Sequence, residues 1–323
     1  MKLSVIIPTH NRAEILKTTL QRVMAQTDID FEVIVVDDGS TDETEQIVRN
    51  FQFPISNDQL NSKFQIPRPN DAVGQANSKN TIQPIIQYLK QPASHQGVAR
   101  NRGVEVATGE IILFIGDDIF VEPGFLKAHL DFHTQHPEEG VVCLGYTTWD
   151  PILPINDYMR FLESSGWQFG YSLLKPGVVD HAEPYKFFYT SNISLKRSFF
   201  NKEKFDENFK VYGWEDIELG YRLWKSHGMK LYYEPLAKAF HHHLLTEEDL
   251  PKKMRAVGQS GAHFEKLHPE VSVVPRGIKA GLIRVLGAPF MLKIAKILSI
   301  TLYYRLWSLA EFLRWAKMGI IAF

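Results

Sequence analysis

The stretch EIILFIGDD, residues 110–118, decides the fold class of this chain. A continuous apolar run of this kind is typical of a strand that is buried on both faces of a parallel sheet. The run ends at Gly116 and two adjacent acids, Asp117 and Asp118. Two neighbouring carboxylates repel one another unless a positive charge lies beside them. The stretch therefore predicts a buried strand that ends in a charged binding site.

The first 145 residues repeat this pattern. Apolar runs that predict strands cover residues 3–8, 31–38, 84–89, 110–116 and 140–145. Segments that predict helices lie between them, at 13–25, after 40, at 97–107 and at 123–137. This alternation predicts an α/β fold, with a mostly parallel central sheet and helices on both faces. Ligands of such sheets bind at the carboxyl ends of the strands, which is where Asp38, Asp117 and Asp118 fall.

The rest of the chain is less regular. Residues 52–83 are rich in Asn, Gln, Ser and Pro and predict an inserted polar loop. Later residues predict strands at 187–196 and 229–241, and helices at 215–227 and 248–267. From residue 278 the chain is apolar and helical. We expect one catalytic or binding domain over 1–270 and a helical tail over 271–323.

Charge separates the tail from the rest of the chain. The whole chain has a net charge of −1, which gives no indication of nucleic-acid binding. Residues 271–323 hold eight Lys or Arg and one acid, Glu311, so the tail carries +7 and the remainder −8. A basic, apolar tail on an acidic body favours an anionic surface as partner. The N-terminus lacks a secretory signal, so we expect a cytoplasmic protein or one peripheral at the inner face of the membrane.

The tail also limits how a membrane could be contacted. Lys293 and Lys296 interrupt the apolar run at 288–307. A central lysine costs roughly 2.5–3.5 kcal/mol in a spanning helix. We therefore expect helices that lie in the membrane interface, with four aromatic rings at headgroup depth. These rings are Tyr303, Tyr304, Trp307 and Trp315. The alternative is that the tail packs on the body or forms a dimer interface.

The acids at the strand ends have two interpretations. Aspartate is a preferred N-cap residue, and Asp38 and Asp118 both precede expected helices by a few residues. One cap needs one carboxylate, whereas Asp117 and Asp118 supply two. A divalent cation would relieve their repulsion, and oxygen ligands suit Mg²⁺ or Mn²⁺. A cation is therefore the preferred interpretation for the pair.

A second acidic group lies in YGWEDIELGYRL, residues 212–223. On a helix, Asp216 lies on the same side as Leu219 and Leu223, so its carboxylate should be partly desolvated. Desolvation raises the pKa of a carboxylic acid, which suits a proton acceptor. The alternative is that Glu215 and Asp216 only favour the helix dipole from the first turn.

Three consecutive histidines lie in AFHHHLL, residues 239–245. Side chains alternate along a strand, so His241 and His243 share one face and His242 faces the other way. Three adjacent histidines do not form a four-ligand zinc site, but one of them could complete a site begun by a distant carboxylate. The remaining histidines, such as those in HLDFHTQH (129–136), are assigned to helix surfaces. The single cysteine, Cys143, is expected to be a buried thiol.

Five sequence motifs follow one another along the chain. They are SVIIPTHNR (4–12), VIVVDDGSTDET (33–44), QGVARNRGVEVATGEIILFIGDD (96–118), TSNISLKRSFF (190–200) and YGWEDIELGYRL (212–223), and AFHHH follows them. In this order they resemble the motifs of a family 2 glycosyltransferase with the Rossmann-like GT-A fold. The resemblance implies an inverting enzyme that takes a sugar from a nucleotide-diphosphate sugar, expected to be a UDP-sugar. The implied acceptor is a glycan or a lipid-linked saccharide.

The resemblance also implies roles for single residues. Asp118 and His241 would bind the divalent cation, Mn²⁺ or Mg²⁺. Asp216 would be the catalytic base, and Glu215 would contact the acceptor. Donor binding is implied for Pro8, Asp38, Gly97, Arg100, Asp117 and Asn192.

One motif departs from the family pattern. The usual Asp-X-Asp signature reads Gly116-Asp117-Asp118, so its first acid is missing. Two other functions remain as alternatives. A sugar nucleotidyltransferase would need a glycine-rich phosphate loop after the first strand, and PTHNRAEIL (8–16) contains no glycine. A non-catalytic nucleotide-binding scaffold is suggested by Gly116 and opposed by the retained acids at 215–216.

Overall fold

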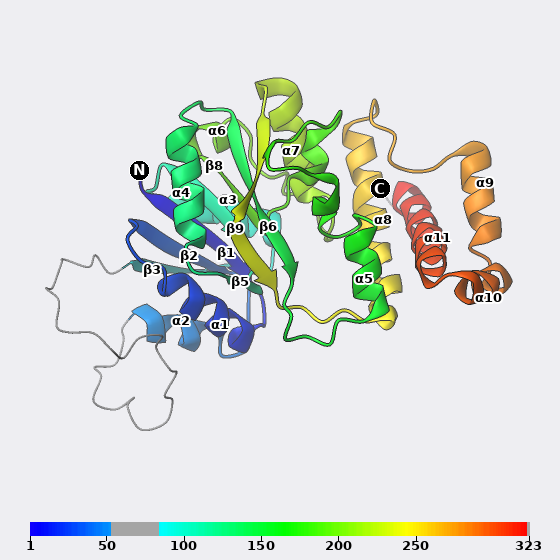
Figure 1. Ribbon diagram of the computed structural model, residues 1–323, viewed down its shortest axis with the longest axis horizontal. Coiled ribbons are helices and arrows are strands. Elements are labelled where there is room, and N and C mark those ends of the chain that lie inside the picture. The colour runs from blue at the N-terminus through cyan, green and yellow to red at the C-terminus, as the bar shows by residue number, and fades with distance from the viewer. Residues whose placement is uncertain (53–83, 322–323) are drawn as a thin grey trace, which may run out of the picture.

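The computed structural model of the protein describes residues 1–52 and 84–321, with side chains placed up to Lys317 (Figure 1). The predicted polar loop at 52–83 therefore lies outside the described residues, except for Gln52, which ends a helix. Figure 1 shows a central sheet with helices on both sides, and the C-terminal helices stand at the edge farthest from β3.

The sheet has nine strands, which run in the order β3-β2-β1-β4-β8-β6-β9-β5, with β7 paired to β9. They are β1 (Leu3–Thr9), β2 (Phe31–Asp37), β3 (Ile85–Lys90), β4 (Ile111–Ile115), β5 (Ile119–Val121), β6 (Val141–Trp149), β7 (Gly177–Val178), β8 (Asn192–Lys196) and β9 (Lys230–His241). The pairings β3-β2, β2-β1 and β1-β4 are parallel, as the alternating pattern predicts. Beyond β4 the sheet is mixed, because β8 is antiparallel to both β4 and β6, and β5 and β7 are antiparallel to β9.

The helices divide between the two faces of the sheet. They are α1 (Ala13–Met24), α2 (Thr44–Gln52), α3 (Gln96–Val106), α4 (Phe125–Gln135), α5 (Asp157–Ser164), α6 (Arg197–Phe200), α7 (Glu215–His227), α8 (Leu250–Leu267), α9 (Gly277–Leu286), α10 (Pro289–Leu298) and α11 (Ile300–Ile321), with single 3₁₀ turns η1 (Gly170–Leu173), η2 (Pro184–Phe187) and η3 (Glu247–Asp249). Helices α1, α2 and α4 share one apolar core, and α3 and α5 to α8 share the other. Side chains of β1 alternate between them, with Val5 and Ile7 in the first and Ile6 in the second.

Two strands differ from their predicted bounds. The strand predicted at 187–196 begins only at Asn192, because Tyr185 and Phe187 are buried from the turn η2. Aromatic residues favour strands in general, which is why the sequence predicted a strand that begins five residues too early. In contrast, β6 continues past residue 145 to Trp149 and keeps its pairing with β9 through a register shift at Gly145 and Tyr146. Such an irregularity is invisible in an apolar pattern.

Two histidines of α4 are buried, so their assignment to a helix surface is wrong. His129 and His133 are both 0% exposed. The ring nitrogens of His129 lie 2.8 Å from Ser194 Oγ and 2.9 Å from Asn192 Oδ1. Burial lowers the pKa of His129 to about 4 and that of His133 to about 3, so both rings are neutral. These rings connect α4 to β8 across the core, where they satisfy buried polar groups. Cys143 is a buried thiol, as predicted.

The last helix of the tail packs on the body. Helix α11 lies along α8, and a Cβ atom at Gly258 would come within 2.6 Å of the carbonyl oxygen of Phe312. This close approach requires the glycine. Phe312, Leu313 and Ala316 are buried with Ala262 of α8. The packing alternative therefore holds for α11.

The tail aromatics follow this packing instead of facing outward. Tyr304 is 4% exposed and contacts Phe161 of α5, with ring centroids 5.6 Å apart. Its hydroxyl and that of Tyr303 donate to Glu247 at 3.0 and 2.9 Å. The two tryptophans also lie against the body, since Trp307 packs on the larger core and Trp315 lies under Arg255. The expectation of headgroup depth is therefore wrong for Tyr304, whereas Tyr303, Trp307 and Trp315 remain partly exposed.

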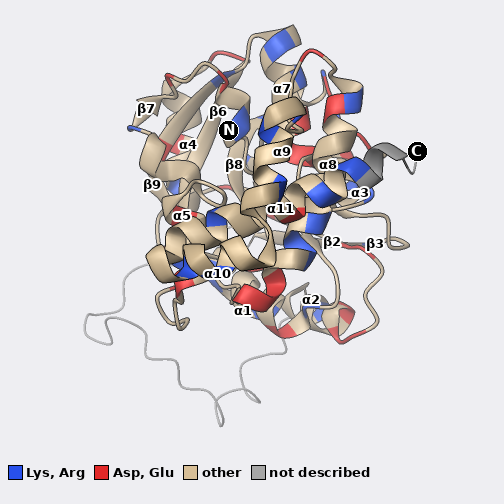
Figure 2. Ribbon diagram, turned by 90° about the vertical axis from the view of Figure 1, so that its right-hand side faces the viewer, with Lys and Arg blue, Asp and Glu red and all other residues tan. Residues whose placement is uncertain are grey.

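Helices α9 and α10 leave other apolar side chains uncovered. Ile278, Phe290 and Ile297 are 93%, 72% and 86% exposed. Figure 2 turns these helices toward the viewer, and blue positions are frequent along α9, α10 and α11. Among the described residues, no helix is both long enough and apolar enough to cross a membrane.

Candidate active site

The turn after β4 carries the acid pair to a second strand. After Ile115 the chain turns and forms β5, which pairs antiparallel with the end of β9 so that Ile119 lies opposite His241. The backbone N–H of His242 donates to the carbonyl oxygen of Asp118 at 2.8 Å. This pairing brings residues that are distant in the sequence together. Because a strand follows Asp118 and not a helix, the capping interpretation does not apply to this residue.

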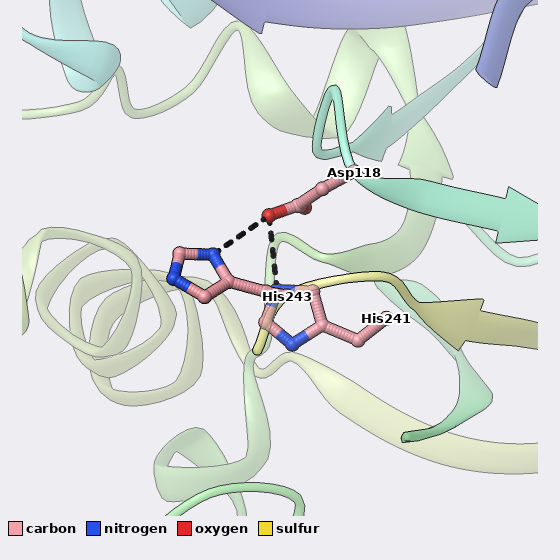
Figure 3. A group of neighbouring side chains, drawn as sticks. All are labelled: Asp118, His241 and His243. Atoms are coloured by element: carbon pink, nitrogen blue, oxygen red, sulfur yellow. Dashed lines mark hydrogen bonds and ion pairs between the residues drawn. The ribbon is translucent and has the colours of Figure 1, made fainter. Parts of the chain in front are cut away.

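Asp118, His241 and His243 form a group that could bind a metal ion (Figure 3). Asp118 Oδ2 lies 3.1 Å from His241 Nε2 and 3.2 Å from His243 Nδ1, and the potential ligand atoms lie within 4.8 Å of one another. His242 points the other way and lies 2.8 Å from Asp150. The alternation predicted for the three histidines is thus present.

Arg12 is a site residue that the sequence analysis missed. Its Nη1 atom donates to Asp117 Oδ1 at 2.7 Å and to Asp118 Oδ2 at 2.8 Å. Its Nη2 atom lies 3.0 Å from His243 Nδ1. Burial alone would raise the pKa of Asp118, but His241, His243 and Arg12 outweigh it and hold that pKa well below its ordinary value. The guanidinium therefore neutralises the acid pair at the position where a cation was expected. No local pattern in the sequence indicates this contact, since Arg12 lies 105 residues from Asp117 along the chain.

Two adjoining cavities of about 600 and 360 Å³ lie at the carboxyl ends of the parallel strands. The larger one is lined by seven of the predicted site residues, namely Pro8, Arg100, Asp117, Asp118, Glu215, Asp216 and His241. The smaller one contains the residues expected at the nucleoside, namely Pro8, Asp38, Gly97 and Asp117. Glu215 lines both. The structure thus brings nearly all of the predicted residues to one place.

Asp38 is held by the segment that follows β3. Its carboxylate accepts hydrogen bonds from the Gln91 side chain and from the backbone N–H groups of Ser94 and His95, each at 2.8 Å. These bonds join β2 to the start of α3. They fix one wall of the smaller cavity and leave Asp38 9% exposed. The Asp38 carboxylate therefore holds this wall in place, and it does not act as the N-cap of α2, the helix that follows β2.

Asn192 is the predicted residue that the structure does not bring to the cavities. Its side chain is 0% exposed, donates to the carbonyl oxygens of Tyr146 and Ala237, and lies beside His129. The preceding Thr190 and Ser191 line the larger cavity. The TSN motif therefore contributes to the cavity wall through its first two residues.

Glu215 and Asp216 begin α7 and have different surroundings. Glu215 is 4% exposed, and its Oε1 atom accepts from Gln96 at 2.6 Å and from Arg100 at 3.4 Å. Its Oε2 atom accepts from the backbone of Gly213 at 3.0 Å. Asp216 lies in the cavity wall with weaker partners, the N–H groups of Ile217 at 2.8 Å and Thr190 at 3.4 Å.

The surroundings of Asp216 change its acidity. Burial, followed by the charge of Glu215, raises the pKa of Asp216 to about 7. Glu215 is held by Arg100 and Gln96. Asp216 has no such side-chain partners within the described part of the chain, and its pKa lies near neutral pH, which suits a proton acceptor. Asp216 is desolvated, as predicted, and Leu219 and Leu223 of the same helix are both 0% exposed.

The fold is shared with solved glycosyltransferases. The Staphylococcus aureus TarS fragment 1–349 in complex with UDP superposes with a TM-score of 0.52 at 19% identity, covering 100% of this chain and 92% of that one. The mannosyltransferase PcManGT of Pyrobaculum calidifontis, solved with GDP-Man and Mn²⁺, gives a TM-score of 0.61 at 15% identity, covering 99% and 87%. These likenesses show that the chain has the GT-A fold.

The family follows from the sequence comparison. The family model described as glycosyl transferase family 2 matches residues 4–82 and 71–194. The chain belongs to this family.

Named relatives extend the similarity further along the chain. A validoxylamine A glucosyltransferase of Streptomyces hygroscopicus subsp. jinggangensis is 32% identical over 249 residues, covering 71% of this chain and 52% of the relative. A chondroitin synthase of Escherichia coli is 27% identical over 251 residues, covering 69% and 32%. The chain therefore spans about half the length, or less, of these relatives.

Proposed function

We propose that this enzyme transfers a sugar from a UDP-sugar to a hydroxyl group of a glycan or lipid-linked saccharide, with inversion at the anomeric carbon. One observation carries the proposal: a single cavity holds the Asp118, His241 and His243 group together with Asp216, whose pKa is raised to about 7. The first group suits a cation at the diphosphate, and the second suits a proton acceptor at the incoming hydroxyl.

The donor set fits a divalent cation. Asp118 Oδ2 and the nitrogens of His241 and His243 would hold it, and when bound it would stabilise negative charge on the departing diphosphate. Two imidazole ligands favour Mn²⁺ over Mg²⁺, because Mg²⁺ prefers oxygen ligands. Arg12 would leave the acid pair and remain available as a cationic partner for phosphate oxygens.

Asp216 would remove the proton from the attacking hydroxyl. Its raised pKa lets it accept that proton near neutral pH, and a base on the acceptor side suits a single displacement with inversion. Glu215 would contact the acceptor through the lone pairs that Arg100 and Gln96 leave free. Pro8, Asp38, Gly97 and Asp117, which line the smaller cavity, would hold the nucleoside and its phosphate side, and Arg100 would face the donor. We assign no donor contact to Asn192.

A hydrolysis screen tests this function. The purified chain is incubated with UDP- and GDP-sugars with and without Mn²⁺, and release of the nucleoside diphosphate is measured. We expect slow, Mn²⁺-dependent release from one UDP-sugar, and its loss in Asp118→Ala. Asp150→Ala removes the acid beside His242 and serves as the matched control. Release of pyrophosphate from a nucleoside triphosphate and a sugar phosphate would indicate a nucleotidyltransferase instead, and nucleotide binding without any turnover would indicate a scaffold.

We also propose that residues 271–323 form an appendage that docks on an anionic membrane surface from the cytoplasmic side. The exposed Ile278, Phe290 and Ile297 supply apolar area, and exposed basic residues such as Lys279 and Arg284 supply charge complementarity.

Vesicle flotation tests the docking surface. Ile278→Asp and Ile297→Asp should each weaken flotation with phosphatidylglycerol vesicles, and high salt should weaken flotation of the unchanged chain. Leu236→Asp, at a 78% exposed position on β9, is the control. Equal flotation of all four proteins would contradict the docking proposal.

A further inference from the structure

The larger cavity extends past the metal-binding group along one continuous segment. After His243 the chain lines it with Leu245, Asp249, Lys252, Lys253 and Ala256, which lead into and along α8. The opposite part of this wall comes from the loop that follows α5, residues 166–169. Neither the donor nor the catalytic base uses this part of the cavity in the function proposed above, on which the following inference rests.

Two lysines occupy an electrostatically unfavourable place on this wall. Lys252 and Lys253 stand in the first turn of α8, where the helix dipole disfavours cations. Lys252 is exposed and makes no ion pair or hydrogen bond with any residue of 1–52 or 84–317. Lys253 is partly buried and donates to the neutral side chain of Gln168. Burial lowers the pKa of Lys253 to about 8, and Asp249 opposes this only in part.

The acid on this wall is already engaged. Both Asp249 contacts are local, because its carboxylate accepts from the backbone N–H of Thr246 at 2.8 Å and from its hydroxyl at 3.1 Å. Glu247 turns away to Tyr303, Tyr304 and Lys296. Asp249 keeps its negative charge and offsets the burial of Lys253 only in part, so two lysines and one acid leave a net positive charge on this part of the cavity wall.

The facing loop is built for contact with a ligand. Phe169 has a φ of +61°, a left-handed conformation that is strained for a bulky residue and tends to occur at functional sites. This conformation turns its ring onto His241, with centroids 5.4 Å apart. Gln168 reaches Lys253, and Trp167 stands beside them in the cavity wall. Tyr212, 52% exposed, lines the same cavity near Asp216.

We propose that Lys252 and Lys253 bind the phosphate or diphosphate of an anionic acceptor, whose sugar ring lies between Trp167 and Tyr212 with one hydroxyl directed to Asp216. In the function proposed above, Asp118 would hold the cation at the donor diphosphate and Arg12 would be a second partner for it. A second cationic centre in the same cavity therefore fits a second anion. The acceptor class is accordingly a glycosyl phosphate, either free or at the head of a lipid.

The test separates acceptor binding from donor binding. The enzyme is first saturated with UDP and Mn²⁺, and it is then titrated with glucose 1-phosphate or with the neutral methyl α-glucoside. We expect glucose 1-phosphate to bind more tightly than the glucoside, and to lose about tenfold in affinity in each of Lys252→Gln and Lys253→Gln. Lys230→Gln, at an exposed position at the start of β9, is the matched control. UDP affinity should be the same in all of these proteins.

Three results would overturn the proposal. One is equal binding of the two probes by the unchanged enzyme, and another is unchanged glucose 1-phosphate affinity in the double variant. The third is a loss of UDP affinity as large as that of glucose 1-phosphate, which would assign the lysines to the donor. Failure of the unchanged enzyme to bind UDP would instead contradict the proposed function, and the same titration without UDP would still report on the lysines. Vesicles that carry a polyprenyl phosphate, compared with free glucose 1-phosphate as competitor, distinguish a lipid-linked acceptor from a free one.

Discussion

Replacing Asp216 by Asn is the change that best tests the assignment of the base. Asn keeps the shape and can still accept from the N–H of Ile217, which donates to Asp216 Oδ1 at 2.8 Å. It cannot take up a proton. Positioned proton transfer contributes typically about 10²–10⁴-fold in rate, so we expect turnover to fall by about that factor with UDP affinity unchanged. The unchanged enzyme should lose activity as the pH falls below about 7, where Asp216 becomes protonated.

The same change should stabilise the fold. Asp216 has its pKa raised from 3.8 to about 7, and each unit corresponds to about 1.36 kcal/mol. Ionised Asp216 therefore costs the folded state at most about 4 kcal/mol. For a carboxyl with a raised pKa, stability is fully present below the unfolded pKa and is lost as the pH rises through the folded value. The gain in Asp216→Asn should thus be absent below pH 4, grow up to about pH 7 and stay constant above it.

Thermal melts and hydrolysis kinetics across this pH range check both parts. After burial, the charges that shift the pKa of Asp216 are those of Glu215, which raises it, and Arg100, which lowers it. Glu215→Gln is therefore a useful comparison, because it should lower that pKa and move the fall in activity to lower pH. The reasoning is refuted if Asp216→Asn keeps full turnover, or if it melts no higher than the unchanged chain at pH 8.

Three other changes address the cation site and the tail. His243→Ala should weaken Mn²⁺ binding measured by calorimetry about tenfold or more, whereas His242→Ala, on the opposite face, should not; equal losses would remove His243 from the ligand set. Arg12→Gln should lower the melting temperature without Mn²⁺, because two buried carboxylates lose their counter-ion. It should also enlarge the increase in melting temperature that Mn²⁺ produces. A smaller increase than in the unchanged chain would show that Arg12 does not compete with the cation. Gly258→Ala should destabilise the chain by about 1–3 kcal/mol in denaturant titrations, because the added carbon meets the backbone of Phe312, and an unchanged midpoint would contradict the packing of α11 on α8.

The sequence was most informative where one chemical requirement governs a whole segment. The apolar run before Asp117 and Asp118 must be buried, so both the strand and its charged end could be predicted. The prediction that His241 and His243 share a face came from strand geometry, and it holds although β9 ends at His241 and His243 lies just beyond it. The desolvation of Asp216 follows from helical spacing beside leucines.

The remainder depends on contacts between distant segments. Nothing local to THNR indicates that Arg12 reaches the acid pair, because the connection exists only once β1 and β4 are paired. Asn192 was expected to contact the donor, but its side-chain oxygen is instead the hydrogen-bond partner of the buried His129. The apolar tail gave no sign of which face would meet α8, since Tyr304 and Ile297 are equally apolar in pattern and only one is covered.

The hydrogen bonds to Glu247 connect the tail to the segment 243–252, which lines the larger cavity. Tyr303, Tyr304 and Lys296 hold this one carboxylate at 2.9, 3.0 and 3.1 Å, and it stands in the sequence between His243 and Lys252. We therefore expect a displacement of α10 or of the start of α11 to move the histidines on one side and the lysines on the other. If the tail docks as proposed, the position of the tail and the width of the cavity would then change together. Cutting away the tail should loosen cation binding even though none of its described residues belongs to the Asp118, His241 and His243 group.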